Sequence, residues 1–165
     1  MTVRVVGDGL VLRQWERADA PAMVALFDDP EVAYWTPLKS PFDLAVAEEY
    51  VDNALATDGR IQLAITTDGI EPLGEVMLNA KTCTLGYAIG PAHRGQHLGS
   101  RALKLLTTYA HEKVGLARVI LEIEPDNAPS SAVARAAGYR LTDLPPTPVV
   151  DKGRSLTLLT WEHFA

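Results

Sequence analysis

The loop at residues 93–100 combines glycines, a fixed positive charge and the start of a helical pattern. It reads His-Arg-Gly-Gln-His-Leu-Gly-Ser, follows a strand-like run that ends at Gly90, and leads into helical periodicity near Leu98. A helix N-terminus leaves backbone N–H groups without partners and carries the positive end of the peptide dipoles. Glycine lets backbone approach a ligand closely, and Arg94 adds five donors. These features predict a phosphate or pyrophosphate site, although such loops also serve only to turn the chain.

A second polar segment, residues 122–130, carries carboxylates, an amide and a hydroxyl from a strand into a helix. A structural explanation is that Asp126 or Asn127 caps this helix and Pro129 starts it. A functional explanation is that Ser130, in the first helical turn, donates a proton into a cleft beside the phosphate loop. Open sheets bind ligands where neighbouring strands end and separate. Both explanations remain open at this point.

The elements that must position these groups follow from hydrophobic periodicity and turn residues. Strands are expected at residues 10–15, 61–66, 73–79, 82–89, 118–124 and 155–164. Helices are expected at residues 20–27, 40–57, 98–114 and 129–137, with Asp19 capping the first and Gly138 ending the last. Residues 143–153, which contain three prolines, are expected to form a loop. This order predicts a mixed α+β fold with an antiparallel meander, in which the strands at 82–89 and 118–124 lie parallel and open a cleft.

The helix expected at residues 40–57 has a strong start signal. Ser40 would be the N-cap, Pro41 would take the first helical position, and Asp43 would reach back to the N–H of the cap. The helix would stop before the Asp58-Gly59 pair. Three aromatic residues, Trp15, Tyr34 and Trp35, either line an acceptor pocket formed by the N-terminal helices or pack in the core.

Length and composition narrow the class of protein. The 165 residues fit a single domain spanning 1–165 with a substantial core. The sequence has no apolar run of membrane-spanning length and no secretion signal, and its single cysteine, Cys83, suits a reducing cytoplasm. The net charge of −6 does not show the excess of basic residues that is typical of proteins that bind nucleic acid. No metal site is expected, because His93 and His97 lack accompanying acidic or cysteine ligands.

The paired motifs resemble those of the GCN5-related N-acetyltransferases (GNAT), most closely the RimJ/RimL-type branch, which acetylates ribosomal-protein alanines. The resemblance rests on residues 94–99 at a helix start and on Asn127, Ser130 and Val133 before Gly138. It extends to segments near both ends of the chain, namely residues 10–13, 28–32 and 85–87. It implies a mostly antiparallel central sheet flanked by helices, with a strand split that forms the cleft for coenzyme A (CoA).

The resemblance also implies acetyl-CoA as the acyl donor. The pyrophosphate would bind the loop formed by Arg94, Gly95, Gln96, His97, Leu98, Gly99 and Ser100. The backbone of Ala88 and Ile89 would pair with the pantetheine arm, and Asn127 would hydrogen-bond the arm from the other side. Ser130 would protonate the departing thiolate.

Two departures from the family pattern bear on the chemistry. His97 stands where the loop motif usually has glycine, so its side chain either points away from the pyrophosphate or adds a donor to it. Thr84 stands where the branch often has a glutamate base, which leaves Glu75 and Glu122 as candidate bases. A tyrosine that acts as the acid in related enzymes corresponds to Ala134 here, which leaves Ser130 for that role.

The expected function is transfer of an acetyl group directly from acetyl-CoA to a primary amine, either a protein N-terminus or a small molecule. One alternative is a catalytically silent acyl-CoA-binding sensor or scaffold protein, and another is a relic of the fold that binds no CoA. No membrane or nucleic-acid partner is expected, and a homodimer remains open.

Overall fold

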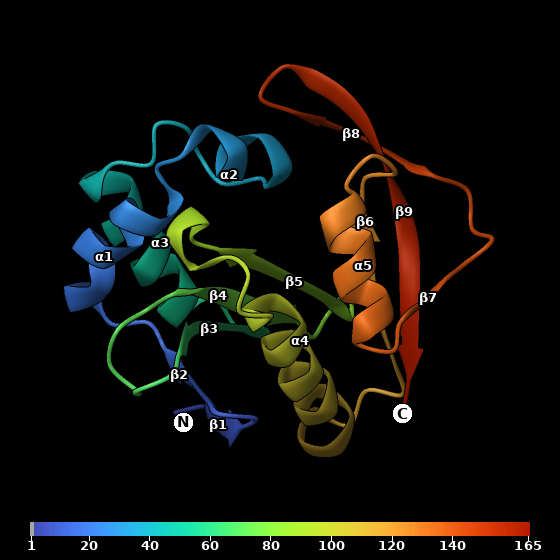
Figure 1. Ribbon diagram of the computed structural model, residues 1–165, viewed down its shortest axis with the longest axis horizontal. Coiled ribbons are helices and arrows are strands. Elements are labelled where there is room, and N and C mark those ends of the chain that lie inside the picture. Colours follow the sequence, from blue (N-terminus) through green and yellow to red (C-terminus); the bar gives the residue numbers. More distant parts are fainter. Residues whose placement is uncertain (1) are drawn as a thin grey trace.

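Within residues 2–165, which the computed structural model describes, nine strands form one mixed sheet (Figure 1). The spatial order is β1-β2-β3-β4-β5-β6-β9-β7, and β8 pairs with β9 outside this path. The strands are β1 (Arg4–Gly7), β2 (Leu10–Gln14), β3 (Arg60–Thr66), β4 (Gly74–Asn79), β5 (Thr84–Ile89), β6 (Arg118–Ile123), β7 (Arg140–Leu141), β8 (Thr147–Asp151) and β9 (Arg154–Phe164). The α-helices are α1 (Ala20–Phe27), α2 (Pro30–Trp35), α3 (Leu44–Ala56), α4 (Leu98–Tyr109) and α5 (Ala128–Ala136). The α+β class with a mostly antiparallel sheet is therefore confirmed.

The sheet splits between β5 and β6. These strands run parallel and are in register only at Thr84 and Ile120, whereas β5 pairs with β4 along its whole length. Figure 1 shows β5 and β6 diverging, with α4 and α5 on the near side of the gap. The part of β5 beyond Thr84 therefore has an edge that does not pair with β6, as the expected strand split requires.

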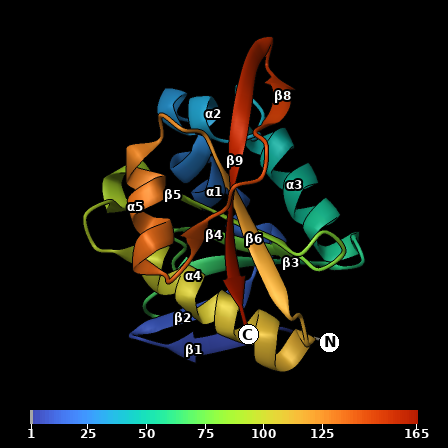
Figure 2. The same cartoon turned by 90° about the vertical axis from the view of Figure 1, so that its right-hand side faces the viewer.

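Two apolar clusters cover the two faces of the sheet. Leu63 and Ile65 of β3 face the cluster built with α4 and α5, whereas Ala64 faces the cluster built with α1 and α3. This arrangement follows from the period-two alternation of side chains in a strand. Figure 2 shows α3 and α5 on opposite sides of the sheet. No helix of residues 2–165 is long and apolar enough to cross a membrane.

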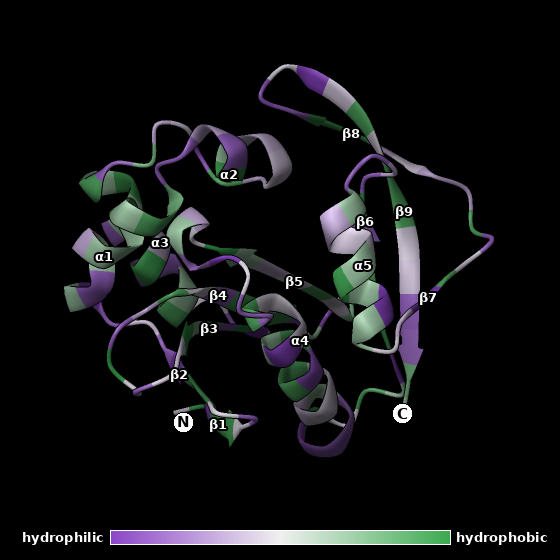
Figure 3. Cartoon of the chain, viewed as in Figure 1, coloured by the Kyte–Doolittle hydropathy of each residue, from purple (hydrophilic) through white to green (hydrophobic). Residues whose placement is uncertain are grey.

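The long helix predicted at residues 98–114 forms as α4 followed by a π-helical turn, Ala110–Val114. Its buried residues recur with helical spacing, and Figure 3 shows apolar and polar residues alternating along α4. Gly115 ends it with a φ of 86°, a left-handed conformation that glycine adopts without strain. This stable packing holds the first turn of α4 against the sheet, beside the split.

The prediction that Ser40 caps the helix expected at residues 40–57, which is α3, is wrong. The helix begins at Leu44, and Asp43 is its N-cap, with Oδ1 accepting a hydrogen bond from the N–H of Val46 at 2.9 Å. Phe42 explains the difference, because its side chain is buried in the core and its N–H donates to Asp28 Oδ1. Anchoring Phe42 in this way leaves the next acidic residue to cap the helix.

The loop predicted at residues 143–153 is also wrong, because it contains β8. The strand pairs with β9 through a turn at Lys152 and Gly153, whose φ angles are 48° and 76°. Positive φ at both positions is typical of a two-residue hairpin turn. Pro148 is tolerated because β8 pairs on one side only. The resulting β8–β9 hairpin extends toward α2 (Figure 1).

Candidate active site

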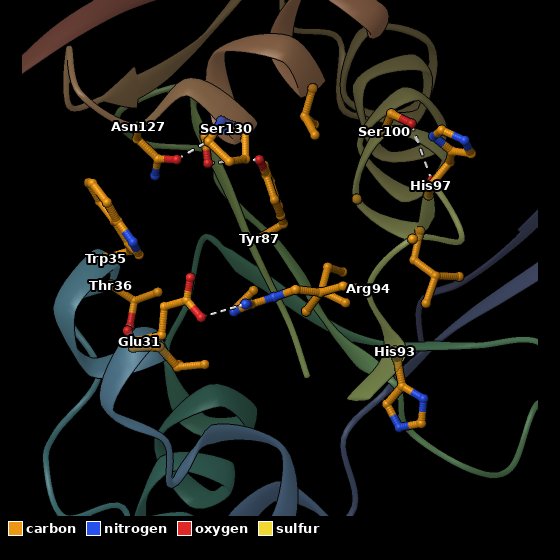
Figure 4. A pocket seen from close by; sticks show the side chains of 18 residues that line it. Glu31, Trp35, Thr36, Tyr87, His93, Arg94, His97, Ser100, Asn127 and Ser130 are labelled. Atoms are coloured by element: carbon orange, nitrogen blue, oxygen red, sulfur yellow. Dashed lines mark hydrogen bonds and ion pairs between the residues drawn. The ribbon is translucent and has the colours of Figure 1, made fainter. Parts of the chain in front are cut away.

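A pocket of about 360 Å³ opens where β5 and β6 diverge (Figure 4). Its walls come from α2, β5, the loop before α4, the first turn of α4, and the start of α5. Ten of the predicted cofactor-binding residues line it: Ala88, Ile89, Arg94, Gly95, His97, Leu98, Gly99, Ser100, Asn127 and Ser130. Gln96 is exposed and does not line the pocket. The structure thus brings the two motifs together from segments about 30 residues apart.

The start of α4 offers free backbone donors to this pocket. No side chain caps the helix, and its first helical hydrogen bond runs from the N–H of Arg101 to the carbonyl of His97 at 3.0 Å. The N–H groups of residues 98–100 therefore precede the intrahelical ladder. An anion is stabilised there by these donors and by the helix dipole.

His97 takes the N-cap position in a left-handed conformation, with a φ of 56°. Gly95, two residues earlier, also has a positive φ of 87°. Histidine is among the residues that adopt this conformation more often than most, at a cost of about 1 kcal/mol. Figure 4 shows the exposed His97 ring directed away from Asn127 and Ser130. The left-handed backbone at residue 97 therefore explains why the loop motif usually has glycine there, without a clash between a side chain and the ligand.

Asn127 and Ser130 meet at the start of α5. Asn127 caps the helix, because its Oδ1 accepts a hydrogen bond from the N–H of Ser130 at 3.2 Å. The structural explanation of Asn127 is therefore correct. The cap uses only Oδ1 of Asn127. Its amide nitrogen points into the pocket (Figure 4), where it can still make the hydrogen bond to the pantetheine arm that the resemblance implies.

Tyr87 lines the pocket and was not among the predicted site residues. Its hydroxyl donates a hydrogen bond to Ser130 Oγ at 3.0 Å, and its ring packs over the first turn of α4. A Cβ on Gly99 would lie 3.2 Å from the ring, so the glycine makes room for it. Burial raises the pKa of Tyr87 above its ordinary value. Alternation along β5 gave it the same signal as a core residue, which is why sequence alone did not single it out.

Glu75 lies one strand away from the pocket and does not line it. Its buried carboxylate accepts hydrogen bonds from Trp15 Nε1 at 2.8 Å and from the Tyr50 hydroxyl at 2.6 Å. Burial raises the pKa of Glu75 to about 7, against the opposing effect of these hydrogen bonds. Glu75 is directly opposite Ala88, and residues in such a pair project to the same face of a sheet. Ala88, one of the residues that line the pocket, is thus the cross-strand neighbour of Glu75.

Glu122, the other candidate base, is exposed on β6 and does not line the pocket. The buried side chains of its neighbours Leu121 and Ile123 project to the opposite face. Of the aromatic residues considered for an acceptor pocket, Trp35 lines the cavity, whereas Trp15 is buried in the core. The structure therefore places Trp35 at the pocket and Trp15 in the core, two roles that the sequence left open for both residues.

Helix α2 forms the remaining wall, with Glu31, Val32, Trp35 and Thr36. The helix was not predicted, although Asp29 caps it by accepting hydrogen bonds from the N–H groups of Glu31 and Val32. Asp-Pro before an apolar run is a recognisable start signal. Its short length of six residues hides the helical periodicity on which the prediction relied.

The β8–β9 hairpin holds this wall in place. Lys152 Nζ donates to the carbonyls of Ala33 and Thr36, each at 2.9 Å. Arg154 donates to the Tyr34 carbonyl, and its guanidinium lies 4.0 Å from the centre of the Tyr34 ring. Cations at the C-terminal end of a helix satisfy its free carbonyls and complement its dipole.

Clusters of three or more His, Cys, Asp or Glu side chains that could hold a metal ion do not occur in the part of the chain that the structure describes. The residues that are present fit CoA instead: free N–H groups for phosphate, a strand edge for the amides of the pantetheine arm, and apolar walls between them. Apolar walls combined with polar groups that fix the orientation of a ligand are typical of small-molecule sites.

Comparison with known proteins agrees with this geometry. The chain is 26% identical over 140 residues to an uncharacterized N-acetyltransferase, p20, of Bacillus licheniformis, with 79% of each chain covered. RimJ of Mycobacterium smegmatis, solved in complex with CoA-disulfide, shares the fold with a TM-score of 0.81 and 18% identity over 99% of this chain and 87% of that one. The microcin C7 self-immunity acetyltransferase MccE, solved with acetyl-CoA and AMP, shares it with a TM-score of 0.83 and 16% identity over 96% and 94%. Residues 9–140 match the acetyltransferase (GNAT) domain family, and the chain therefore belongs to the GNAT family of acetyl-CoA-dependent acetyltransferases.

Proposed function

We propose that the protein is an N-acetyltransferase of the RimJ/RimL type, formed by residues 1–165 as one domain, that transfers an acetyl group from acetyl-CoA to a primary amine. One observation carries the proposal: a single pocket joins the uncapped start of α4, the free edge of β5, and Ser130. These are a phosphate site, a site for an amide-bearing arm, and a hydroxyl donor.

The residues divide the binding of acetyl-CoA between them. The N–H groups of residues 98–100 receive the pyrophosphate, and Gly95 lets the loop turn beside it. The unpaired edge of β5 at Ala88 and Ile89 pairs with the pantetheine amides, as an added strand would. Asn127 donates its amide N–H from the opposite wall.

The reaction requires a neutral amine close to the thioester. An alkyl amine has a pKa of about 10, so it must lose a proton before it attacks. Glu75 accepts this proton through water beyond Ala88, and its pKa of about 7 suits a base that works near neutral pH. Ser130 assists the thiolate, which leaves readily because its conjugate thiol has a pKa of roughly 8–9. Positioning of amine and thioester supplies much of the acceleration.

The acceptor enters beside α2. Glu31 places one carboxylate and Trp35 one aromatic ring on this wall, which suits an amine carried on an apolar or cationic group. The acidic net charge of the chain also favours approach of a cation. A peptide N-terminus and a small amine share this chemistry.

A thiol-release assay tests the proposed function. Acetyl-CoA is mixed with the protein and with two acceptor panels, N-terminal peptides and small amines, and free thiol is followed over time. We expect a rate that is first order in enzyme with at least one acceptor, and no covalent acetyl-enzyme by intact mass after an acid quench. Tight acetyl-CoA binding without thiol release across both panels would instead identify a silent CoA-binding sensor or scaffold.

A further inference from the structure

We propose that Tyr87 is a positioning residue for Ser130, whose proton it directs toward the departing sulfur by donating a hydrogen bond to Ser130 Oγ. The inference rests on the proposed function. Figure 4 shows Tyr87 on β5 and Ser130 on α5 meeting across the pocket, at the place where the strands separate. The pair thus joins the two sides of the sheet split.

Both partners are held firmly. The N–H of Ser130 is fixed by Asn127 Oδ1, and the Tyr87 ring packs closely over Gly99 at the start of α4. The ring therefore has little freedom to withdraw its hydroxyl. The 3.0 Å hydrogen bond is set by three elements, β5, α4 and α5, and does not depend on a flexible loop.

The direction of this hydrogen bond determines what Ser130 can do. A serine hydroxyl has one proton and two acceptor lone pairs. Because Tyr87 is the donor, Ser130 Oγ is the acceptor, and its own proton is free for another partner. The adjacent Ser131 donates to the carbonyl of Asn127, a common use of a helical serine. Ser130 donates to no residue among 2–165, which leaves its proton for a group in the pocket.

This arrangement suits the step in which sulfur leaves. The amine nitrogen forms a bond to the acetyl carbon, the carbon–sulfur bond breaks, and its electron pair goes to sulfur. One proton leaves nitrogen and one proton comes to rest on the thiol, so the proton count balances. The Ser130 O–H binds the sulfur as its negative charge develops. Donation from Tyr87 strengthens the Ser130 O–H as a donor, because linked hydrogen bonds polarise one another.

A double-mutant cycle tests the inference on the intact protein. Tyr87→Phe keeps the ring and removes only the donor, and Ser130→Ala removes the hydroxyl that it orients. We expect Tyr87→Phe to lower kcat by about 3- to 10-fold, the range for one hydrogen bond. Its KM and Kd for acetyl-CoA should stay within about twofold of wild type. The double variant should be no slower than Ser130→Ala alone, because Tyr87 acts only through Ser130.

Tyr139→Phe is the matched control. Tyr139 forms a hydroxyl–hydroxyl hydrogen bond of 2.6 Å with Thr107 in the same apolar core, and neither residue lines the pocket. Loss of this hydrogen bond should lower the melting temperature of the protein without changing kcat. Ser130→Thr, which keeps a hydroxyl, should restore the sensitivity to Tyr87→Phe that Ser130→Ala abolishes.

Each outcome decides between the two proposals. An unchanged kcat in Tyr87→Phe, or a loss in the double variant equal to the product of the single losses, overturns the role of Tyr87 and leaves the proposed function intact. A loss confined to the KM for acetyl-CoA would assign Tyr87 to binding and also overturns the inference. Absence of thiol release by wild type overturns the proposed function and this inference together.

Discussion

Arg94 on the loop before α4 and Glu31 on α2 form an ion pair across the pocket, with Nη1 2.6 Å from Oε2. The guanidinium and the carboxylate are about half exposed, at 45% and 58%. Figure 4 shows the pair spanning the space between the loop before α4 and helix α2. Arg94 is also a cation beside the proposed pyrophosphate site. In the proposed function, the cofactor would therefore compete with Glu31 for this side chain, and the ion pair would connect the binding of acetyl-CoA with that of the acceptor.

Substitution Glu31→Gln should tighten acetyl-CoA binding, since Arg94 then loses its carboxylate partner. Exposed ion pairs contribute about 0.2–1 kcal/mol, so the expected decrease in Kd is up to about fivefold. The KM for a cationic acceptor should rise, because the wall loses its charge. Isothermal titration calorimetry at low and high salt gives the Kd, and the effect should shrink as salt rises. Glu48→Gln, which breaks the Arg17–Glu48 pair of 2.8 Å outside the pocket, is the control. Weaker acetyl-CoA binding in Glu31→Gln would refute the competition.

Substitution His97→Gly should leave acetyl-CoA affinity unchanged within about twofold. The His97 ring is exposed and points away from the pocket centre, so it contributes no required donor. Glycine relieves the left-handed backbone strain, and its greater freedom in the unfolded chain offsets this gain, so stability should change by less than about 1 kcal/mol. His97→Ala, which removes the ring but keeps the strain, separates the two effects. A fall of tenfold or more in affinity for both variants would show that the imidazole binds phosphate.

The sequence predicted the residues that line the pocket better around the start of α4 than around α2. Residues 93–100 and Asn127 could be found because glycines, a helix start and a strand end carry local signals. Tyr87 and Glu31 could not, because their roles depend on which segments meet in space. Tyr87 follows ordinary strand alternation, and Glu31 lies in a helix too short to show periodicity.

The β-hairpin at residues 147–164 illustrates the same limit. Three prolines indicated a loop, yet Pro148 fits an edge strand because pairing with β9 occurs on one side. The buried Phe42 likewise moved the start of α3 to Leu44. In both cases tertiary contacts decided between local signals of similar strength.

Substitution Lys152→Ala should loosen helix α2, the wall of the pocket beside which we propose that the acceptor enters. It removes two hydrogen bonds to the end of α2, at Ala33 and Thr36, while leaving the phosphate loop untouched. We expect the KM for the amine to rise about 3- to 10-fold, with the KM for acetyl-CoA unchanged. Initial-rate kinetics with each substrate varied in turn separate these constants. Lys39→Ala, at an exposed lysine that is 3.9 Å from Glu49, is the control. Equal increases in both KM values would contradict a role confined to the acceptor wall.

Glu75 should make stability depend on pH in a direction opposite to that of most carboxylates. Its pKa is raised from 4.5 to about 7, so the folded state binds this proton more tightly than the unfolded state does. The stabilisation is present below about pH 4.5 and is lost as pH rises to about 7, a change of roughly 3 kcal/mol. Glu75→Gln, which does not titrate, should lose this dependence. Urea unfolding of both proteins between pH 4.5 and 8 gives the difference in unfolding free energy.

Taking that difference isolates Glu75 from groups that titrate in the same range. His163 is the main one, because burial and the nearby His111 lower its pKa. Its contribution to stability is lost as pH falls below about 6.5, opposite in sign to that of Glu75, and it is common to both proteins.

The catalytic rate of the same variant tests the proposed base. Glu75→Gln should reduce kcat about 100-fold or more at pH 7.5 if the carboxylate accepts the amine proton. A variant that loses the stability slope but keeps its kcat would assign Glu75 to the hydrogen bonds with Trp15 and Tyr50 alone.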